Sequence, residues 1–312
     1  MINTALLPAD KDPMGAAIAD YFKRHKADRL RVFSSQFDED EIPVEELFRT
    51  EKQMPLLERT ALQMATGRIL DVGAGSGCHS LTLQEAGKEV HAIDISPLSV
   101  EVMKQRGVRS VSQTNLFNEQ FADEYDTILM LMNGSGIIGK LENLPDFFRK
   151  MKLLLRPGGC VLMDSSNLSY LFEEEDGSIV INLAGDYYGE VDFQMQYKNV
   201  KGDSFDWLYI DFQTLSIYAA ENGFKAELVK EVHIMTILPN YPDKHKSEVP
   251  PKSFCLTFRV HFYGKKSFSM CGPLFQFYAA GSGASPLPPS SGFSGLFPPP
   301  FPEEVPPAPA VL

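Results

Sequence analysis

A short apolar run followed by a glycine-rich turn most constrains how this 312-residue chain can fold. Residues 69–72 have the composition of a buried strand, and Gly73, Gly75 and Gly77 follow at every second position. Glycines let a ligand approach the backbone where a Cβ would collide. The helix expected after the turn begins with free N–H groups, which favour an anionic ligand group. The segment therefore predicts a strand–turn–helix unit that binds a ligand.

From residue 68 onward, strand and helix patterns alternate, which is typical of a mostly parallel sheet with helices on both faces. The strands are apolar on both sides, as residues 128–132 show, so both sheet faces should be covered. We expect a three-layer, doubly wound α/β fold, with five strands over residues 68–72, 89–94, 109–113, 126–132 and 160–164. The expected helices span residues 76–86, 97–106 and 141–155. An antiparallel pair over residues 227–238 and 254–262 would complete seven strands.

Changes in composition divide the chain into three parts. Residues 1–54 should form a helical cap with one extended piece at residues 31–35, and residues 55–263 a ligand-binding domain. Within that domain, residues 168–210 contain consecutive strand candidates, at 179–183, 190–197 and 206–210, which predict an antiparallel flap. Residues 264–312 are rich in Pro, Gly and Ser, and such a composition predicts disorder.

Asp71 precedes the three glycines and completes an acidic-x-Gly-x-Gly-x-Gly pattern. This pattern resembles motif I of the class I S-adenosylmethionine-dependent methyltransferases. The alternative, a dinucleotide-binding turn, has its third glycine one place later, where this chain has Cys78. Finer features resemble a bacterial branch of the same family: they are Asp12-Pro13-Met14-Gly15, Leu131-Met132-Asn133-Gly134 and Tyr187-Tyr188-Gly189-Glu190-Val191.

The resemblance implies a Rossmann-like fold, the cofactor S-adenosyl-L-methionine and a set of residues that bind it. In that family pattern Asp94 accepts the ribose hydroxyls, Ile95 packs on adenine, and Asn115 accepts the adenine amino proton. A turn-forming role is the competing explanation for Asn115. The implied cofactor-binding residues are Asp71, Gly73, Ala74, Gly75, Gly77, Asp94, Ile95, Asn115, Leu116, Met132 and Asn133.

The flap offers side chains that could orient a methyl acceptor, namely Tyr187, Tyr188 and Glu190. These are the candidate catalytic residues, although tyrosines in a strand more often serve in packing. Methyl transfer depends mainly on alignment and on the exclusion of water, so a general base matters only if the acceptor arrives protonated. His79, on the first helix after the turn, is interpreted as a surface or packing residue. The His and Cys residues lack a zinc-binding spacing, so we expect no metal.

The net charge of −12 argues against a broad electrostatic interaction with nucleic acid. The apolar runs are too short for a membrane span, and the N-terminal residues lack a secretory signal pattern. The four cysteines are scattered, which favours a reduced, cytoplasmic setting. The expected partner is a small-molecule acceptor, and the oligomeric state stays open.

Three functions remain to be compared. The first is methyl transfer to a small molecule, with the cap and the flap above the cofactor. The second is a protein that binds the cofactor without transferring its methyl group. The third is an NAD(P)-dependent oxidoreductase built on the same type of turn.

Overall fold

The computed structural model describes residues 2–174, 176–181, 185–235 and 252–262. From residue 230 onward it describes the backbone alone. The α-helices are α1 (Pro13–Arg24), α2 (Leu56–Met64), α3 (Cys78–Glu85), α4 (Pro97–Gln105), α5 (Leu144–Leu154) and α6 (Phe212–Glu221). Short 3-10 helices span Ala9–Lys11, Val44–Phe48, Glu51–Gln53, Gly134–Ile138, Leu141–Asn143 and Leu168–Phe172. Among the described residues, we find no helix with the length and apolar character needed to cross a membrane.

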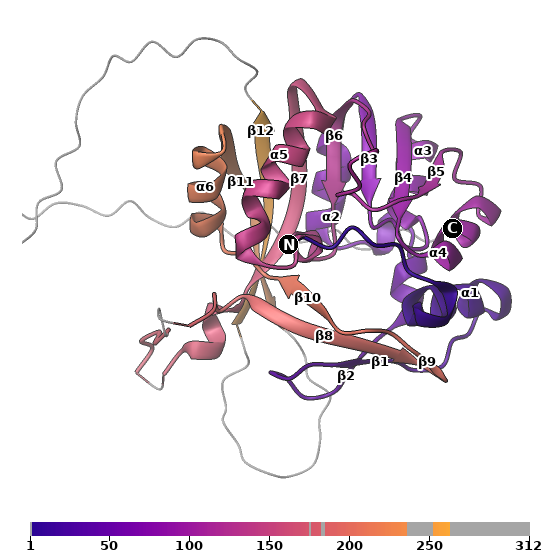
Figure 1. The fold of residues 1–312 in the computed structure, drawn as a ribbon, viewed down its shortest axis with the longest axis horizontal. Helices are drawn as coiled ribbons and strands as arrows, with labels where there is room; N and C mark the ends of the chain where they lie inside the picture. The colour runs from indigo at the N-terminus through magenta and orange to yellow at the C-terminus, as the bar shows by residue number, and fades with distance from the viewer. Residues whose placement is uncertain (1, 175, 182–184, 236–251, 263–312) are drawn as a thin grey trace, which may run out of the picture. The chain divides into compact units, whose positions relative to one another are not determined.

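The strands form two sheets. The large sheet contains β3 (Arg68–Val72), β4 (Glu89–Asp94), β5 (Val111–Gln113), β6 (Tyr125–Met130), β7 (Leu155–Asn167), β11 (Phe224–Met235) and β12 (Lys252–Phe262). The small sheet contains β1 (Leu30–Phe33), β2 (Asp40–Ile42), β8 (Glu190–Tyr197), β9 (Val200–Lys201) and β10 (Phe205–Leu208). The small sheet and α1 lie beyond the carboxyl ends of the parallel strands (Figure 1).

The large sheet has the order β11-β12-β7-β6-β3-β4-β5. Parallel pairings join five of its seven strands, from β7 to β5. The strand β12 runs antiparallel to both β7 and β11, so β11 shares the direction of the five. This arrangement confirms the expected doubly wound, mostly parallel fold. The change of direction in strand order at β3 places the glycine turn where such sheets bind ligands.

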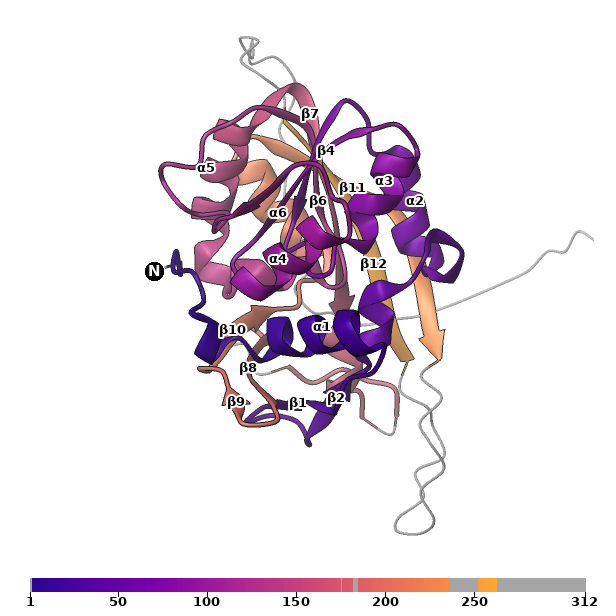
Figure 2. The same cartoon turned by 90° about the vertical axis from the view of Figure 1, so that its right-hand side faces the viewer.

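Apolar side chains alternate between the two faces of the large sheet, as strand geometry requires. Leu70 and Ile128 pack with α5 and α6 on one face, while Ile69 and Leu129 pack with α2 and α3 on the other. A further cluster joins Ala92 of β4 to α4 on the second face. The sheet is therefore covered on both sides, in three layers (Figure 2).

Two local expectations for this sheet need correction. The strand β6 ends at Met130 rather than residue 132, because Met132 and Asn133 have φ values of 66° and 58°. The last parallel strand was expected at residues 160–164, after Pro157-Gly158-Gly159. Instead, β7 begins at Leu155, and the segment between the β6 pairings of Leu155 and Cys160 forms a bulge inside it.

The N-terminal segment is less helical than expected, because β1 and β2 belong to the small sheet. β8 pairs antiparallel with β1 on one side and with β10 on the other. The antiparallel flap is thus present, but it incorporates two strands from the N-terminal segment. A small apolar core packs Ala17 of α1 against Leu30, Val44 and Tyr197 in this part of the protein.

The expected strand at residues 179–183 does not form over its described part. Ile179 makes a single antiparallel bridge with Glu173, and residues 182–184 lie outside the described residues. The expected disordered tail, residues 264–312, also lies outside them, as do residues 236–238 at the end of the expected strand 227–238.

Candidate functional site

The glycine turn connects β3 to α3 at the carboxyl edge of the large sheet. Gly73, Gly75 and Gly77 all have positive φ values, of 67°, 56° and 84°. At Gly77 a Cβ would also lie 2.9 Å from Met103 of α4, so both the backbone conformation and the packing require glycine there. The turn therefore has the tight geometry that its sequence predicts.

The N–H groups of this turn are not free, contrary to the expectation for an anion-binding turn. Gly73 and Ala74 donate to the carbonyl oxygen of Ile93, at 2.9 and 3.1 Å, and Gly77 donates to that of Ala74. Gly75 donates to the carboxylate of Asp94, over 2.8 Å. The end of β4 lies close enough to accept these bonds, so an anionic ligand group would have to meet the first turn of α3 instead.

Asp94 ends β4 and points toward the glycine turn. Its two oxygens accept from the backbone N–H groups of Gly75 and Ser96, each over 2.8 Å. Burial raises its pKa to about 6, although both hydrogen bonds oppose the shift. The carboxylate is held in place by these two bonds, and Asp94 as a whole residue is half-buried at the sheet edge.

Asp71 lies at the other end of the predicted motif and is almost fully buried. One oxygen accepts from the Ser80 hydroxyl of α3, over 2.6 Å. Burial raises the pKa of Asp71, and nearby His79 and Ser80 reduce that shift. The side chain therefore links β3 to α3 under the turn.

A buried ionic cluster beside Asp71 was not predicted. His79 Nε2 lies 2.7 Å from a carboxylate oxygen of Glu58 in α2, and Arg49 pairs with the other oxygen. His79 is 5% exposed, so the surface interpretation is wrong and the packing interpretation is right. Burial alone would lower the pKa of His79, but its bond to Glu58 and the charge of Asp71 raise it. The sequence did not predict this cluster, because Arg49, Glu58 and His79 come from three different segments.

The residues after β5 make contacts within the chain that the sequence did not predict. Asn115 Oδ1 accepts from the N–H of Phe117, over 2.9 Å. This bond is the local contact of a turn-forming asparagine. Its Nδ2 donates to the carbonyl oxygens of Asn3 and Ala5, over 3.2 and 3.1 Å. Leu116 is 2% exposed and belongs to the main core. Both side chains are therefore already engaged within the chain, and the cofactor-binding roles of Asn115 and Leu116 stay predictions.

Ile95 and the loop after β6 lie on either side of the glycine turn. Ile95 is half-buried, and its carbonyl oxygen accepts from the N–H of Leu7. Met132 is 36% exposed, and Asn133 accepts from the Ser166 hydroxyl over 2.8 Å. Ile137, in the 3-10 helix that follows, lies 3.1 Å from where a Cβ on Gly73 would be. Met132 and Asn133 thus stay candidates for the methyl-bearing end of the cofactor.

The three predicted catalytic side chains are engaged in structural contacts. The hydroxyls of Tyr187 and Tyr188 lie 2.6 and 3.0 Å from the same oxygen of Asp211, the residue that caps α6. Burial raises the pKa of both phenols, while these hydrogen bonds lower that of Asp211. Phenols held in this way are poor proton acceptors, so their catalytic role stays a prediction. Asp211 itself was missed, because a cap residue carries no separate sequence signal for such contacts.

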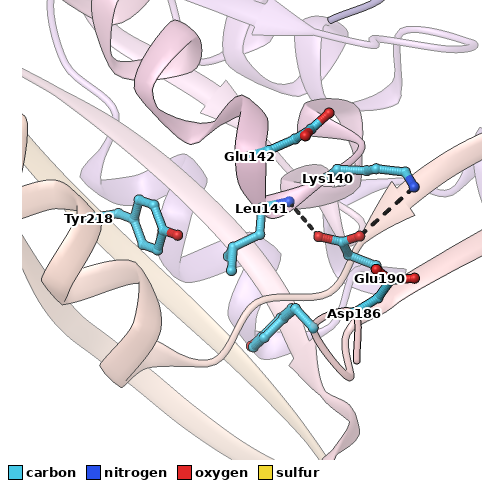
Figure 3. A pocket seen from close by; sticks show the side chains of 7 residues that line it. Lys140, Leu141, Glu142, Asp186, Glu190 and Tyr218 are labelled. Carbon is cyan, nitrogen blue, oxygen red and sulfur yellow. Dashed lines mark hydrogen bonds and ion pairs between the residues drawn. The ribbon is translucent and has the colours of Figure 1, made fainter. Parts of the chain in front are cut away.

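Glu190 begins β8 and lies in a shallow pocket of about 360 Å³ (Figure 3). It accepts from the N–H of Leu141 over 2.9 Å, and its other oxygen lies 4.0 Å from Lys140 Nζ. These bonds attach the small sheet to the segment before α5. Among the described residues, no group of His, Cys, Asp and Glu is placed to hold a metal ion, and the expectation that none binds stays a prediction.

The chain is similar to several methyltransferases. Residues 69–159 match the family described as a methyltransferase domain. A crystal structure of an S-adenosylmethionine-dependent methyltransferase from Bacteroides fragilis, in complex with S-adenosyl-L-homocysteine, is 68% identical to the chain. The likeness covers 84% of this chain and 99% of that one, with a TM-score of 0.73.

Two curated relatives are both described as ubiquinone biosynthesis O-methyltransferase. The protein from Xanthomonas oryzae pv. oryzae (strain PXO99A) is 30% identical over 109 residues, which cover 34% of this chain and 46% of that protein. The one from Bordetella avium (strain 197N) is 30% identical over 130 residues, covering 37% and 51%. The chain thus spans about half the length of these relatives. Its high identity to the bacterial enzyme over that enzyme's whole length means that the chain belongs to the S-adenosylmethionine-dependent methyltransferases.

Proposed function

We propose that this protein transfers a methyl group from S-adenosyl-L-methionine to a small-molecule acceptor. The observation that carries the proposal is the position of Asp94, whose carboxylate is held against the glycine turn at the carboxyl edge of the sheet. A carboxylate fixed there can accept both hydroxyls of a ribose. The complex of the Bacteroides fragilis enzyme with S-adenosyl-L-homocysteine supports the same cofactor.

The residues around the turn fit the parts of this cofactor. Gly73 is exposed, so a ligand can approach its backbone. The first turn of α3 can receive the carboxylate group, because a helix N-terminus favours negative charge. Asp71 lies beside that turn and supplies negative charge near the expected ammonium group.

When bound, the cofactor supplies a methyl carbon that is activated for in-line displacement. The chain's own contribution is alignment and the exclusion of water. Ile18 of α1 is fully buried and lies 3.9 Å from where a Cβ on Gly75 would be. The ring of Trp207, from β10, lies against the backbone of Gly136 in the loop after β6. The cap and the small sheet thus cover this edge from two sides, and we propose that the acceptor binds beneath them.

An oxygen acceptor on a small aromatic or phenolic molecule is the first class to test, because two relatives are O-methyltransferases. We also propose a cytoplasmic setting, which the two buried free cysteines, Cys78 and Cys160, support. The reaction can be tested with a methyl-labelled cofactor and a panel of phenols and catechols. Transfer to none of them, together with transfer to an amine panel, would contradict the oxygen acceptor.

Calorimetric titration with S-adenosyl-L-homocysteine tests the cofactor assignment directly. We expect saturable binding with one ligand per chain. An absence of heat at millimolar ligand, with the fold intact by circular dichroism, would refute the proposed function. A parallel titration with NADH distinguishes the oxidoreductase, for which binding of NADH alone is expected.

A further inference from the structure

The first residues of the chain run along the edge where the nucleoside of the cofactor is expected. Asn115, after β5, donates to the carbonyl oxygens of Asn3 and Ala5. Leu7 donates its N–H to the carbonyl oxygen of Ile95, after β4, over 3.2 Å. The segment then enters α1 next to α4, as Figure 2 shows.

A third attachment joins this segment to the residue expected to bind ribose. Asp12 caps α1 and accepts from the Ser96 hydroxyl, over 2.5 Å, and the N–H of Ser96 donates to Asp94. Gly15 has no room for a Cβ, which would lie 2.2 Å from Asp12 Oδ2 and 2.4 Å from Ser96 Oγ. The close packing keeps Asp12 fully buried. A short chain of hydrogen bonds therefore runs from the cap to Asp94.

All three attachment points lie on the loops that follow β4 and β5. Ligands of doubly wound sheets bind in the crevice beyond these strand ends. Residues 3–6 are themselves exposed, so the segment is held mainly by the hydrogen bonds described above. Such a segment opens at low free-energy cost compared with the core.

We propose that residues 3–12 form a strap that closes the nucleoside end of the cofactor site, and that Asp12 positions Asp94 through Ser96. This inference rests on the proposed function. It assigns the N-terminal residues to cofactor retention, whereas Asn115 becomes an anchor for the strap and not a ligand of adenine. Because binding and strap closure are coupled, the cofactor must stabilise the closed strap as much as the strap stabilises the bound cofactor.

The substitution Asn115→Asp separates the two roles of this residue. It keeps the oxygen that accepts from Phe117, but it replaces the donor to Asn3 and Ala5 with an oxygen facing their carbonyls. If Asn115 anchors the strap, S-adenosyl-L-homocysteine should dissociate about tenfold faster from the variant, a change equal to about 1.4 kcal/mol. If Asn115 binds adenine, the new carboxylate accepts the amino proton and dissociation becomes slower. Unchanged or slower dissociation therefore overturns the proposal.

Asn118→Asp is the matched control, since it makes the same chemical change three residues away. The Asn118 side-chain oxygen accepts from Gln120 and makes no described contact with the strap. We expect its dissociation rate to equal that of the unmodified protein. Equal acceleration in both variants would assign the effect to added charge and overturn the proposal.

Hydrogen exchange of the unmodified protein gives a second test that needs no variant. S-Adenosyl-L-homocysteine should slow exchange at the Leu7 amide about tenfold or more, because the ligand holds the strap closed. Ligand binding that leaves exchange at Leu7 unchanged overturns the strap. Absence of any ligand binding refutes the proposed function instead, so the two failures are distinguishable.

Discussion

The two sheets of this protein differ in how far apart their paired strands lie along the sequence. In the parallel part of the large sheet, the strands from β3 to β7 come from one segment of about a hundred residues, and β3, β6 and β7 at its centre are buried on both faces. In the small sheet, β8 pairs with β1 although the partners Leu30 and Tyr197 are 167 positions apart. Ion pairs such as Arg31–Glu39 and Lys11–Asp203 around the small sheet are exposed. The cofactor edge thus belongs to a sheet with a large apolar core, whereas the small sheet that covers it has a small apolar core.

The difference suggests that the large sheet and the small sheet have separate roles. A turn that must hold a cofactor gains from a rigid base, whereas a cover must open for ligands to enter and leave. Specific contacts join the two parts, among them Ser96–Asp12 and Gly136–Trp207. The following predictions test this contrast.

Matched core substitutions should have the largest effects. Leu70 in β3 and Leu30 in β1 are both fully buried. Leu70→Ala should lower the free energy of unfolding by about 2–5 kcal/mol, as large-to-small core changes do. Leu30→Ala should lower it less, because the small sheet can open while the large sheet stays folded. Urea unfolding monitored by circular dichroism measures both, and equal losses would contradict the contrast.

Removal of the ribose-binding carboxylate should be next in size. Asp94→Ala should weaken binding of S-adenosyl-L-homocysteine by about 1.5–3 kcal/mol, the range for hydrogen bonds to a charged group. Calorimetry gives the affinity, and Asp40→Ala on the exposed strand β2 is the control with the same loss of charge. Unchanged affinity in a folded Asp94→Ala protein would remove Asp94 from the site.

Affinity should also depend on pH through Asp94. Its pKa is raised to about 6 by burial, so the carboxylate is ionised at pH 7 and mostly protonated at pH 5. If the ionised form accepts the ribose hydroxyls, affinity should fall about tenfold between these pH values, or about 1.4 kcal/mol. Burial also raises the pKa of Asp164 to about 6. The same titration of Asp94→Ala separates the two groups, since that variant should lose most of the dependence.

Loss of the α1 cap should have the smallest effect on stability. Asp12 accepts from the N–H of Gly15 over 2.8 Å, and Asp12→Ala removes this bond together with that to Ser96. We expect a loss of about 1 kcal/mol, typical of a helix N-cap. Asp10→Ala, at an exposed position, should change stability by less than about 0.5 kcal/mol. Thermal unfolding compares the two, and a similar result for both would mean that the cap is not stabilising.

The sequence predicted most of the large sheet because its signals are local. The bounds of β3 and β4 match the expectation, and the ends of α3, α4 and α5 differ from it by at most three residues. Apolar runs and glycine turns arise from residues that are close along the chain. The glycine turn and the position of Asp94 were predictable for the same reason.

The engagement of individual side chains was not predictable in this way. Asn115 bonds to residues 3 and 5, and Tyr187 bonds to Asp211, and each pair is distant in sequence. A pattern that suggests a ligand contact cannot reveal that another part of the chain already makes it. This is why the bonds of Asn115 to residues 3 and 5 and the pairing of β1 with β8 were missed.

What the chain's local pattern determined by itself is the α/β framework and the glycine turn that ends β3, because backbone propensity and alternating burial act between neighbours. Tertiary structure alone decided which groups remain available for a ligand. The end of β4 accepts from the N–H groups of Gly73, Ala74 and Gly75. The Nδ2 donor of Asn115 and the phenols of the flap also have partners distant in sequence, since a buried polar group must find a partner somewhere in the fold.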